Sequence, residues 1–304
     1  GSVKITLPNG TEKTYYYTYT TPSGYTETST RVTSPSSSNV TNVVFKNIKY
    51  TTPGRGGAAI CNTVDNSTLD VVADFVGNYS YYSSYGSMRG GAVYNSGKLN
   101  SISGKFLNNG ISTKGDYTAT YGGAIYNKGT ITTVNADFVG NYSKGIVNSY
   151  WPYIYGGAVY NEGTITNLTG KFVGNYTYDI VNKSDSSYMA RGGALYNTKN
   201  ISSLVSDFVG NYAFSTYYSY GGAIYNTGTI SSLTGDFISN YVSSKYTASY
   251  GGAIYNTSSN GIGLTNNKFI GNYAISTSGK ALGGAIYTTN SLTISADNGT
   301  TLFS

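Results

Sequence analysis

The sequence predicts an all-β protein folded as a right-handed parallel β-helix, a solenoid with about eight rungs and one rung per repeat. Three observations support this prediction. A motif close to Gly-Gly-Ala-Ile-Tyr-Asn recurs every 29 to 36 residues, a Phe-x-x-Asn motif follows each of its first seven copies, and no stretch shows the 3.6-residue apolar period of a helix. The Gly-Gly pairs begin at Gly56, Gly90, Gly122, Gly156, Gly192, Gly221, Gly251 and Gly283. The Phe-x-x-Asn motifs begin at Phe75, Phe106, Phe138, Phe172, Phe208, Phe237 and Phe269.

Each repeat divides into a rigid part and a variable part. The distance from the first Gly of the pair to Phe is 16 residues in five consecutive repeats, whereas the distance from Phe to the next pair varies from 13 to 20 residues. The additional residues are mainly Tyr, Ser, Thr, Asn and Lys. We therefore expect the variable part to be a surface loop, which is where a repetitive scaffold usually carries its binding residues.

The rigid part predicts three β-runs per turn. In the third repeat these runs are residues 124–127, 130–132 and 134–141, with a turn at Lys128-Gly129. Alternation along the last run places Phe138 inside and Asp137 outside. Stacked rungs would then form an outward ladder of mostly alternating charge. Its members are Asp74, Lys105, Asp137, Lys171, Asp207, Asp236 and Lys268.

The sequence does not decide which side chains of the Ala-Ile-Tyr-Asn run point into the core. The Ile position always holds Ile, Val or Leu, which favours the core and would turn the Tyr position outward. The opposite facing is the alternative, because Cys61 occupies the Tyr position of the first repeat and cysteine is usually buried. In either case, the stacked Asn residues at the turn could bond along the axis as an amide ladder. They are Asn62, Asn95, Asn127, Asn161, Asn197, Asn226 and Asn256.

From about Phe45 to Ser304 the chain resembles the passenger of polymorphic outer-membrane protein type autotransporters, whose repeats pair Gly-Gly-Ala-Ile with Phe-x-x-Asn. The resemblance implies a secreted passenger displayed at the bacterial cell surface, commonly an adhesin. It also implies a tether to the outer membrane through a C-terminal domain that lies outside the present sequence. The expected partner is a protein or glycan on a host or neighbouring cell.

We expect two segments in the chain. Residues 1–42 lack the repeat and form a capping or upstream segment in which Gly1-Ser2 resembles a cloning scar, and residues 43–304 form the repeat domain. The sequence stops two residues into another Phe-x-x-Asn motif, so we expect truncation at that end. A solenoid cut in this way exposes strand edges, and edge-to-edge self-association is therefore possible.

The composition argues against an enzyme, a cofactor and a metal. There is no histidine, so a Ser-His-Asp or Cys-His site cannot form, and the excess positive charge of 6 is too scattered for nucleic acid. The rung prediction brings one carboxylate pair together, Asp207 and Asp236, and we interpret it as a solvated ladder step. Asp179 and Asp185 share a long loop but lack the spacing of a calcium loop.

Tyrosine carries the functional prediction, because 34 of the 304 residues are Tyr. We expect the tyrosines within the motifs to stack along the rungs, with Arg191 between Tyr155 and Tyr220. Aromatic residues in the variable loops have the composition of adaptable recognition surfaces. The predicted binding residues are Tyr81, Tyr82, Tyr85, Tyr150, Trp151, Tyr153, Tyr217 and Tyr218. The favoured function is an adhesin; a passive stalk is the alternative, and a polysaccharide-binding or polysaccharide-cleaving β-helix ranks last.

Overall fold

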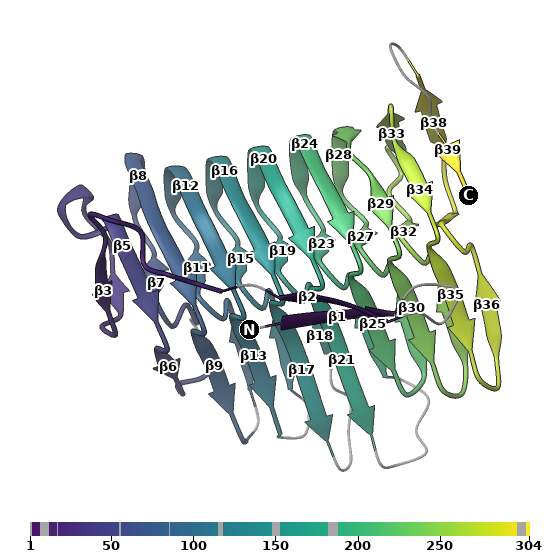
Figure 1. Cartoon of the computed structure of the whole chain (residues 1–304), viewed down its shortest axis with the longest axis horizontal. Coiled ribbons are helices and arrows are strands. Elements are labelled where there is room, and N and C mark those ends of the chain that lie inside the picture. Colours follow the sequence, from purple (N-terminus) through teal and green to yellow (C-terminus); the bar gives the residue numbers. More distant parts are fainter. Residues whose placement is uncertain are drawn as a thin grey trace.

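The computed structural model describes residues 2–6, 12–16, 18–54, 56–84, 86–114, 118–147, 153–181, 188–296 and 302–304. These residues form a parallel β-helix of about eight coils, stacked along the long axis of the molecule (Figure 1). The single helical element among them is the 3-10 helix η1 (Ser37–Asn39). No helix in the described part of the chain is long and apolar enough to cross a membrane.

Each full coil contributes strands to four sheets, so the prediction of three β-runs is wrong. In the third repeat they are β15 (Ile125–Asn127), β16 (Thr130–Val139), β17 (Tyr142–Val147) and β18 (Tyr153–Tyr155). The two runs predicted after the turn are one continuous strand, because nothing in Thr130–Val139 breaks an extended chain. The expected surface loop supplies two further strands, since its residues after Asn141 also pair with the coils above and below.

The four strands of successive coils build four parallel sheets, numbered here in coil order. Sheet 1 contains β4 (Val32–Thr33), β7 (Ile60–Asn62), β11 (Val93–Asn95), β15, β19 (Val159–Asn161), β23 (Leu195–Asn197), β27 (Ile224–Asn226), β32 (Ile254–Asn256) and β37 (Ile286–Thr288). Sheet 2 contains β3 (Thr26–Thr28), β5 (Thr41–Lys46), β8 (Asp65–Val76), β12 (Lys98–Leu107), β16, β20 (Thr164–Val173), β24 (Asn200–Val209), β28 (Thr229–Thr234), β29 (Phe237–Ile238), β33 (Ile262–Thr265), β34 (Lys268–Ile270), β38 (Leu292–Ser295) and β39 (Leu302–Phe303).

Sheets 3 and 4 are built from the variable part of each repeat. Sheet 3 contains β6 (Lys49–Tyr50), β9 (Tyr79–Tyr82), β13 (Gly110–Thr113), β17, β21 (Tyr176–Val181), β25 (Tyr212–Ser215), β30 (Tyr241–Ser244) and β35 (Tyr273–Ser276). Sheet 4 contains β10 (Ser87–Arg89), β14 (Ala119–Tyr121), β18, β22 (Met189–Arg191), β26 (Tyr218–Tyr220), β31 (Ala248–Tyr250) and β36 (Lys280–Leu282). A separate antiparallel hairpin is formed by β1 (Ser2–Thr6) and β2 (Glu12–Tyr16).

The apolar core lies between sheets 1 and 2. The phenylalanines of the repeat are buried there and stack on one another, with neighbouring ring centroids 4.3 to 4.9 Å apart from Phe75 to Phe269. Ile125 belongs to this core, whereas Tyr126 belongs to a second buried cluster with the other tyrosines of its position. The structure thus places the Ile position inside and the Tyr position on the opposite face of sheet 1.

Two asparagine ladders run along the rod. In the predicted ladder, Nδ2 of Asn95 donates to Oδ1 of Asn127, and Nδ2 of Asn127 donates to Oδ1 of Asn161, both at 2.8 Å. The second ladder, which the sequence analysis missed, uses the Asn of Phe-x-x-Asn. There the backbone N–H and Nδ2 of Asn141 both donate to Oδ1 of Asn175 at 2.9 Å. Each ladder satisfies buried polar groups at a corner between sheets, where strand pairing is interrupted.

The outward ladder of charges is held mainly by backbone contacts. Oδ1 of Asp137 accepts a hydrogen bond from the backbone N–H of Lys171 at 3.1 Å, and Asp207 and Asp236 make the same contact at 3.0 Å. Among the described members of this ladder, one ion pair forms, in which Nζ of Lys268 lies 3.7 Å from Oδ2 of Asp236. The prediction of an exposed ladder is wrong for Asp74, which is buried because the N-terminal segment covers it.

The two ends of the stack differ. At the N-terminal end, β3 and β4 add to sheets 2 and 1, and the side chains of Val40 and Phe45 are fully buried. At the C-terminal end, Ile294 and Phe303 are 45% and 48% exposed, although Phe303 still stacks on Phe269. The segment before residue 43 therefore closes one end of the core, and the last coil leaves apolar side chains open to solvent.

Candidate ligand-binding surface

Sheets 3 and 4 pack back to back and form a two-layered projection along the rod, which we call the blade. Small hydroxyl residues and apolar residues together fill the space between the two sheets. Ser143 Oγ donates to the carbonyl of Gly156 at 3.0 Å, and Thr118 Oγ1 donates to Thr113 Oγ1 at 3.0 Å. Apolar side chains share this interior, among them the fully buried Met88, Ile111 and Ile154, and rows of tyrosines lie on the two outer faces of the blade.

The outer face of sheet 3 carries a row of half-buried aromatic rings, interrupted at Gly110, and we call it the aromatic face. Its first column is Tyr79, Tyr142, Tyr176, Tyr212, Tyr241 and Tyr273, and its second column includes Tyr81, Tyr178 and Phe214. From Tyr142 to Tyr273 the ring centroids are 5.0 to 5.5 Å apart and the planes differ by 2 to 16°. This spacing follows the separation of neighbouring strands, about 4.8 Å.

The rings of the aromatic face are half-buried, so part of each side chain is open to solvent. Burial raises the pKa of Tyr176 to about 12, and the pKa of Tyr142 is raised for the same reason. These phenols therefore stay protonated at physiological pH and can both donate and accept hydrogen bonds. Two cations lie over the rings: Lys49 Nζ is 5.7 Å from the Tyr81 centroid, and Lys144 Nζ is 5.6 Å from the Tyr178 centroid.

A hollow of about 320 Å³ lies beside this row of rings. Tyr142, Tyr176 and Tyr212 form one side, and Asn108, Gly140 and Gly174, at the corner between sheets 2 and 3, form another. Ser2 of the N-terminal hairpin also lines the hollow. The volume lies at the lower end of the range of small-molecule sites, roughly 300 to 1,000 Å³. The aromatic face thus combines stacked rings, hydroxyl groups and a hollow along one side of the rod.

The outer face of sheet 4 is also lined by tyrosines, and these lean against the tyrosines of sheet 1. The ring of Tyr121 meets the ring of Tyr160 edge-on, with centroids 4.9 Å apart. The guanidinium carbon of Arg191 lies 5.4 Å from the Tyr155 centroid and 5.6 Å from that of Tyr220, which confirms the predicted stacking. Arg191 takes the place of a ring in this column, because it pairs with Tyr155 and Tyr220 of the neighbouring coils, and its Nε is buried without a hydrogen-bond partner.

The predicted loop aromatics are distributed over different parts of the blade. Tyr81 lies on the aromatic face, and Tyr153 and Tyr218 lie on the outer face of sheet 4, each stacked with the second tyrosine of its strand. Tyr82 pairs with Thr113, whose side chain is buried, and Tyr217 is only 8% exposed beside Tyr188. The predictions for Tyr85, Tyr150 and Trp151 fall outside the described residues.

The loop position expected for Asp179 is wrong. Asp179 lies in β21 with its side chain fully buried between the two sheets of the blade, where Ser215 Oγ donates to its Oδ2 at 2.6 Å. Burial raises the pKa of this carboxyl to about 7, and its Oδ1 has no hydrogen-bond partner. The strand extends this far because Asp179 and Ile180 continue the pairing of Gly145 and Ile146. Asp185 is outside the described residues.

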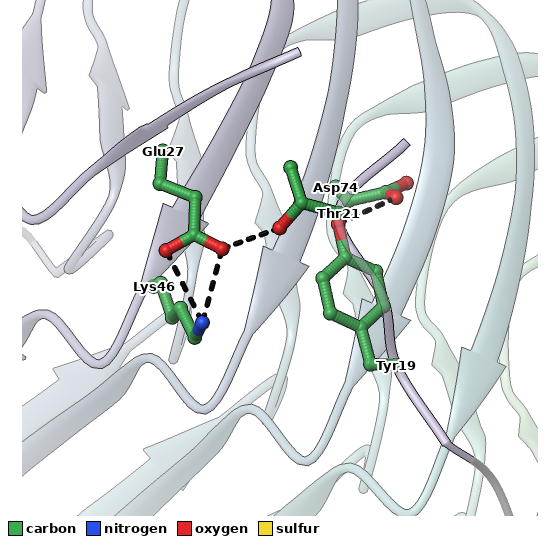
Figure 2. A network of polar contacts seen from close by, with 5 residues as sticks. All are labelled: Tyr19, Thr21, Glu27, Lys46 and Asp74. Carbon is green, nitrogen blue, oxygen red and sulfur yellow. Dashed lines mark hydrogen bonds and ion pairs between the residues drawn. The ribbon is translucent and has the colours of Figure 1, made fainter. Parts of the chain in front are cut away.

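An N-terminal segment, residues 18–25, crosses the outer face of sheet 2 before the chain enters that sheet as β3, and we call it the strap. Figure 2 shows its two anchors: the hydroxyl of Tyr19 donates to Asp74 Oδ2 at 3.0 Å, and Glu27 pairs with Lys46 Nζ at 3.0 Å. Thr21 also donates to the carboxylate of Glu27. Sequence analysis missed this contact, although the Pro22-Ser23-Gly24 turn marks the segment as ordered.

In comparisons with known proteins, no family model, curated protein or solved structure matches this chain. In the described part of the chain, no group of three or more His, Cys, Asp or Glu side chains could hold a metal ion. The surfaces described above therefore carry the functional inference.

Proposed function

We propose that this chain is part of a secreted adhesin, displayed at a bacterial cell surface, whose blade contacts a protein or glycan on a host or neighbouring cell. The aromatic face is the single observation that carries this proposal. Tyrosines are enriched at protein recognition surfaces because a rigid ring and a hydroxyl provide contact area and hydrogen bonds at little entropic cost. Here such rings repeat in register along one side of an elongated scaffold.

Half-exposed rings in one long row support an interaction role. Contiguous aromatic surface in water favours association, so it usually marks a binding patch. The cations over Tyr81 and Tyr178 and the protonated hydroxyl groups add polar contacts, which suit a glycan or a polar protein surface. The resemblance of the repeats to autotransporter passengers supports display at the cell surface with a tether to the outer membrane. The proposal includes no catalytic step, no cofactor and no nucleic acid.

A passive stalk is a second candidate, and one observation favours it. Nearly every tyrosine in the ladders contacts the rings above and below it, so the stacking by itself accounts for much of the tyrosine content. In that case the rod would only hold another domain away from the membrane. The two functions differ in whether the outer rings contact a ligand.

Binding of the purified chain to a glycan array and to cultured cells tests the proposal. We expect binding to fall at least tenfold, about 1.4 kcal/mol, when the aromatic face is changed by Tyr178→Ser with Phe214→Ser. Tyr153→Ser tests the sheet 4 face in the same way. Val205→Ser, on the outer face of sheet 2, removes a side chain that is 47% exposed and serves as the matched control. Absence of binding by the unmodified, folded chain to every glycan and cell type would favour the stalk.

A further inference from the structure

The strap holds one aromatic residue over sheet 2 by a tight turn. The backbone N–H of Tyr25 donates to the carbonyl of Pro22 at 3.1 Å, and Gly24 between them has a φ of +82°. A positive φ at the third residue of a turn requires glycine or asparagine, so the sequence specifies this turn. The anchors at Tyr19 and Glu27 lie on either side of it and fix its position on the sheet (Figure 2).

A hollow of about 340 Å³ separates the turn from the sheet. Pro22 and Tyr25 line it on the strap side, and Ser103, Lys105, Asn135 and Asp137 line it on the sheet side. An aromatic ring therefore faces hydroxyl, amide, ammonium and carboxylate groups across a space large enough for a small molecule. This hollow lies on sheet 2 and is separate from the aromatic face on sheet 3.

The polar groups of the hollow retain hydrogen-bonding capacity. Oδ1 of Asp137 accepts the backbone N–H of Lys171 at 3.1 Å, and a carboxylate can accept several further bonds. Oδ1 of Asn135 accepts from Thr169 Oγ1 at 3.1 Å, which leaves its NH₂ group to donate. Asp74 differs, because its two oxygens already accept from Tyr19 and from the backbone of Lys105.

Tyr25 also differs from the tyrosines of the ladders. No ring among the described residues stacks on it, and its side chain is half-exposed. The Tyr25 ring therefore does not contribute to the stacking of one coil on the next. A phenol ring over a polar floor offers an electron-rich face and a row of hydrogen-bonding groups to the same ligand.

We propose that this hollow binds one residue of a neutral saccharide. The C–H face of a pyranose ring packs against the electron-rich face of Tyr25, while its hydroxyl groups donate to Asp137 and accept from Asn135. The nearby carboxylates of Asp74 and Asp137 outnumber Lys105, so an anionic sugar is disfavoured relative to a neutral one. This inference does not depend on the proposed function of the blade, because the two surfaces share no residue.

The site is tested by titrating the full chain with glucose, galactose and N-acetylglucosamine. Binding is measured by the NMR shifts of backbone amides and by calorimetry. We expect at least one neutral sugar to shift the amides of residues 23–25, 103–105 and 135–137, and glucuronic acid to bind at least tenfold more weakly. Tyr25→Ala and Asp137→Asn should each weaken binding by tenfold or more, and Tyr25→Phe should retain most of it.

Two matched variants control for folding. Asp207→Asn changes the same ladder position, with the same backbone contact, outside the hollow, and Tyr246→Ala removes another exposed tyrosine. Both should bind as the unmodified chain does, and all variants should keep its melting temperature. No amide shift with any neutral sugar, or equal losses in Asp137→Asn and Asp207→Asn, would overturn the assignment. A loss of sugar binding that leaves cell attachment unchanged would separate this site from the blade.

Discussion

The phenyl rings of Phe138 and Phe172 stack almost parallel, with centroids 4.6 Å apart and 8° between their planes. The two residues are 34 positions apart in the sequence and directly paired in sheet 2. Each ring therefore fills space for its own coil and supports the next one. The same relationship repeats along the rod, so the core contains a continuous column of rings. A cavity in one coil therefore removes packing contacts from the coils on both sides of it.

Phe138→Ala should lower the free energy of unfolding by about 3 to 5 kcal/mol, because it leaves a ring-sized cavity in a fully buried column. Asp137→Ala should cost only about 1 kcal/mol, since it removes one partly exposed hydrogen bond. Urea denaturation followed by circular dichroism measures both values. Similar losses for the two variants would contradict the division into a buried and an outward face.

Asn127→Ala should cost about 3 kcal/mol. The substitution removes the 2.8 Å bonds that join Asn127 to Asn95 and to Asn161, and all three side chains are fully buried. It also leaves the carbonyls of Gly129 and Thr164 without the Nδ2 donor of Asn127, whereas Nδ2 of Asn95 keeps longer bonds to two backbone carbonyls. Asn135→Ala, on the exposed side of the next strand, should change stability by less than about 0.5 kcal/mol. Denaturation curves of the two variants give the comparison; a small loss at Asn127 would show that water replaces the amide in the ladder.

Gly122→Ala should destabilise the chain by about 2 kcal/mol or more. Gly122 has a φ of +70°, and an added Cβ would lie 2.0 Å from the carbonyl oxygen of Ile125. In Gly263→Ala the nearest atom to the new Cβ is 3.7 Å away, so that variant should be close to neutral. Thermal melting of both proteins tests whether the corner between sheets 4 and 1 requires glycine.

The stability of the chain should fall as pH rises from about 4 to about 7 and then level off. Burial raises the pKa of Asp179 from 3.8 to about 7, so the folded state holds this proton more tightly than the unfolded state. Above pH 7 the ionised group costs at most about 4 kcal/mol. Asp179→Asn should remove this part of the pH dependence and be the more stable protein at pH 8. Denaturation of Asp179→Asn and of the unmodified chain at several pH values measures the difference, and an equal pH dependence of the two would contradict the prediction.

Arg191→Tyr should be neutral or stabilising, by up to about 1 kcal/mol, because the neighbouring coils hold Tyr155 and Tyr220 at this position. The new ring would complete the column and remove the unpartnered Nε. Arg191→Ala should destabilise by about 1 to 2 kcal/mol through lost packing and cation-π contacts. A melting temperature for Arg191→Tyr well below that of the unmodified chain would show that the guanidinium has a specific role.

Periodicity alone determined the parallel solenoid, the inward phenylalanines and the position of the first asparagine ladder. Each of these depends on contacts between equivalent positions of successive repeats, so a motif at fixed spacing specifies them. The second asparagine ladder was present in the same motifs. Its Nδ2-to-Oδ1 bonds repeat as in the first ladder, and what the motif does not show is the additional bond from each backbone N–H to the same Oδ1.

Only the tertiary structure decided how the variable segments and the N-terminal segment are used. The segments after Asn141 look like loops in the sequence, yet they become strands because their counterparts in adjacent coils offer free backbone groups for pairing. That pairing buried Asp179 and Tyr217 and turned Tyr81 and Tyr178 outward. Likewise, Tyr19 and Tyr25 lie on sheet 2 through contacts with residues about 50 or more positions away. The sequence records which residues repeat, but contacts between segments that do not repeat depend on how the folded coils place them.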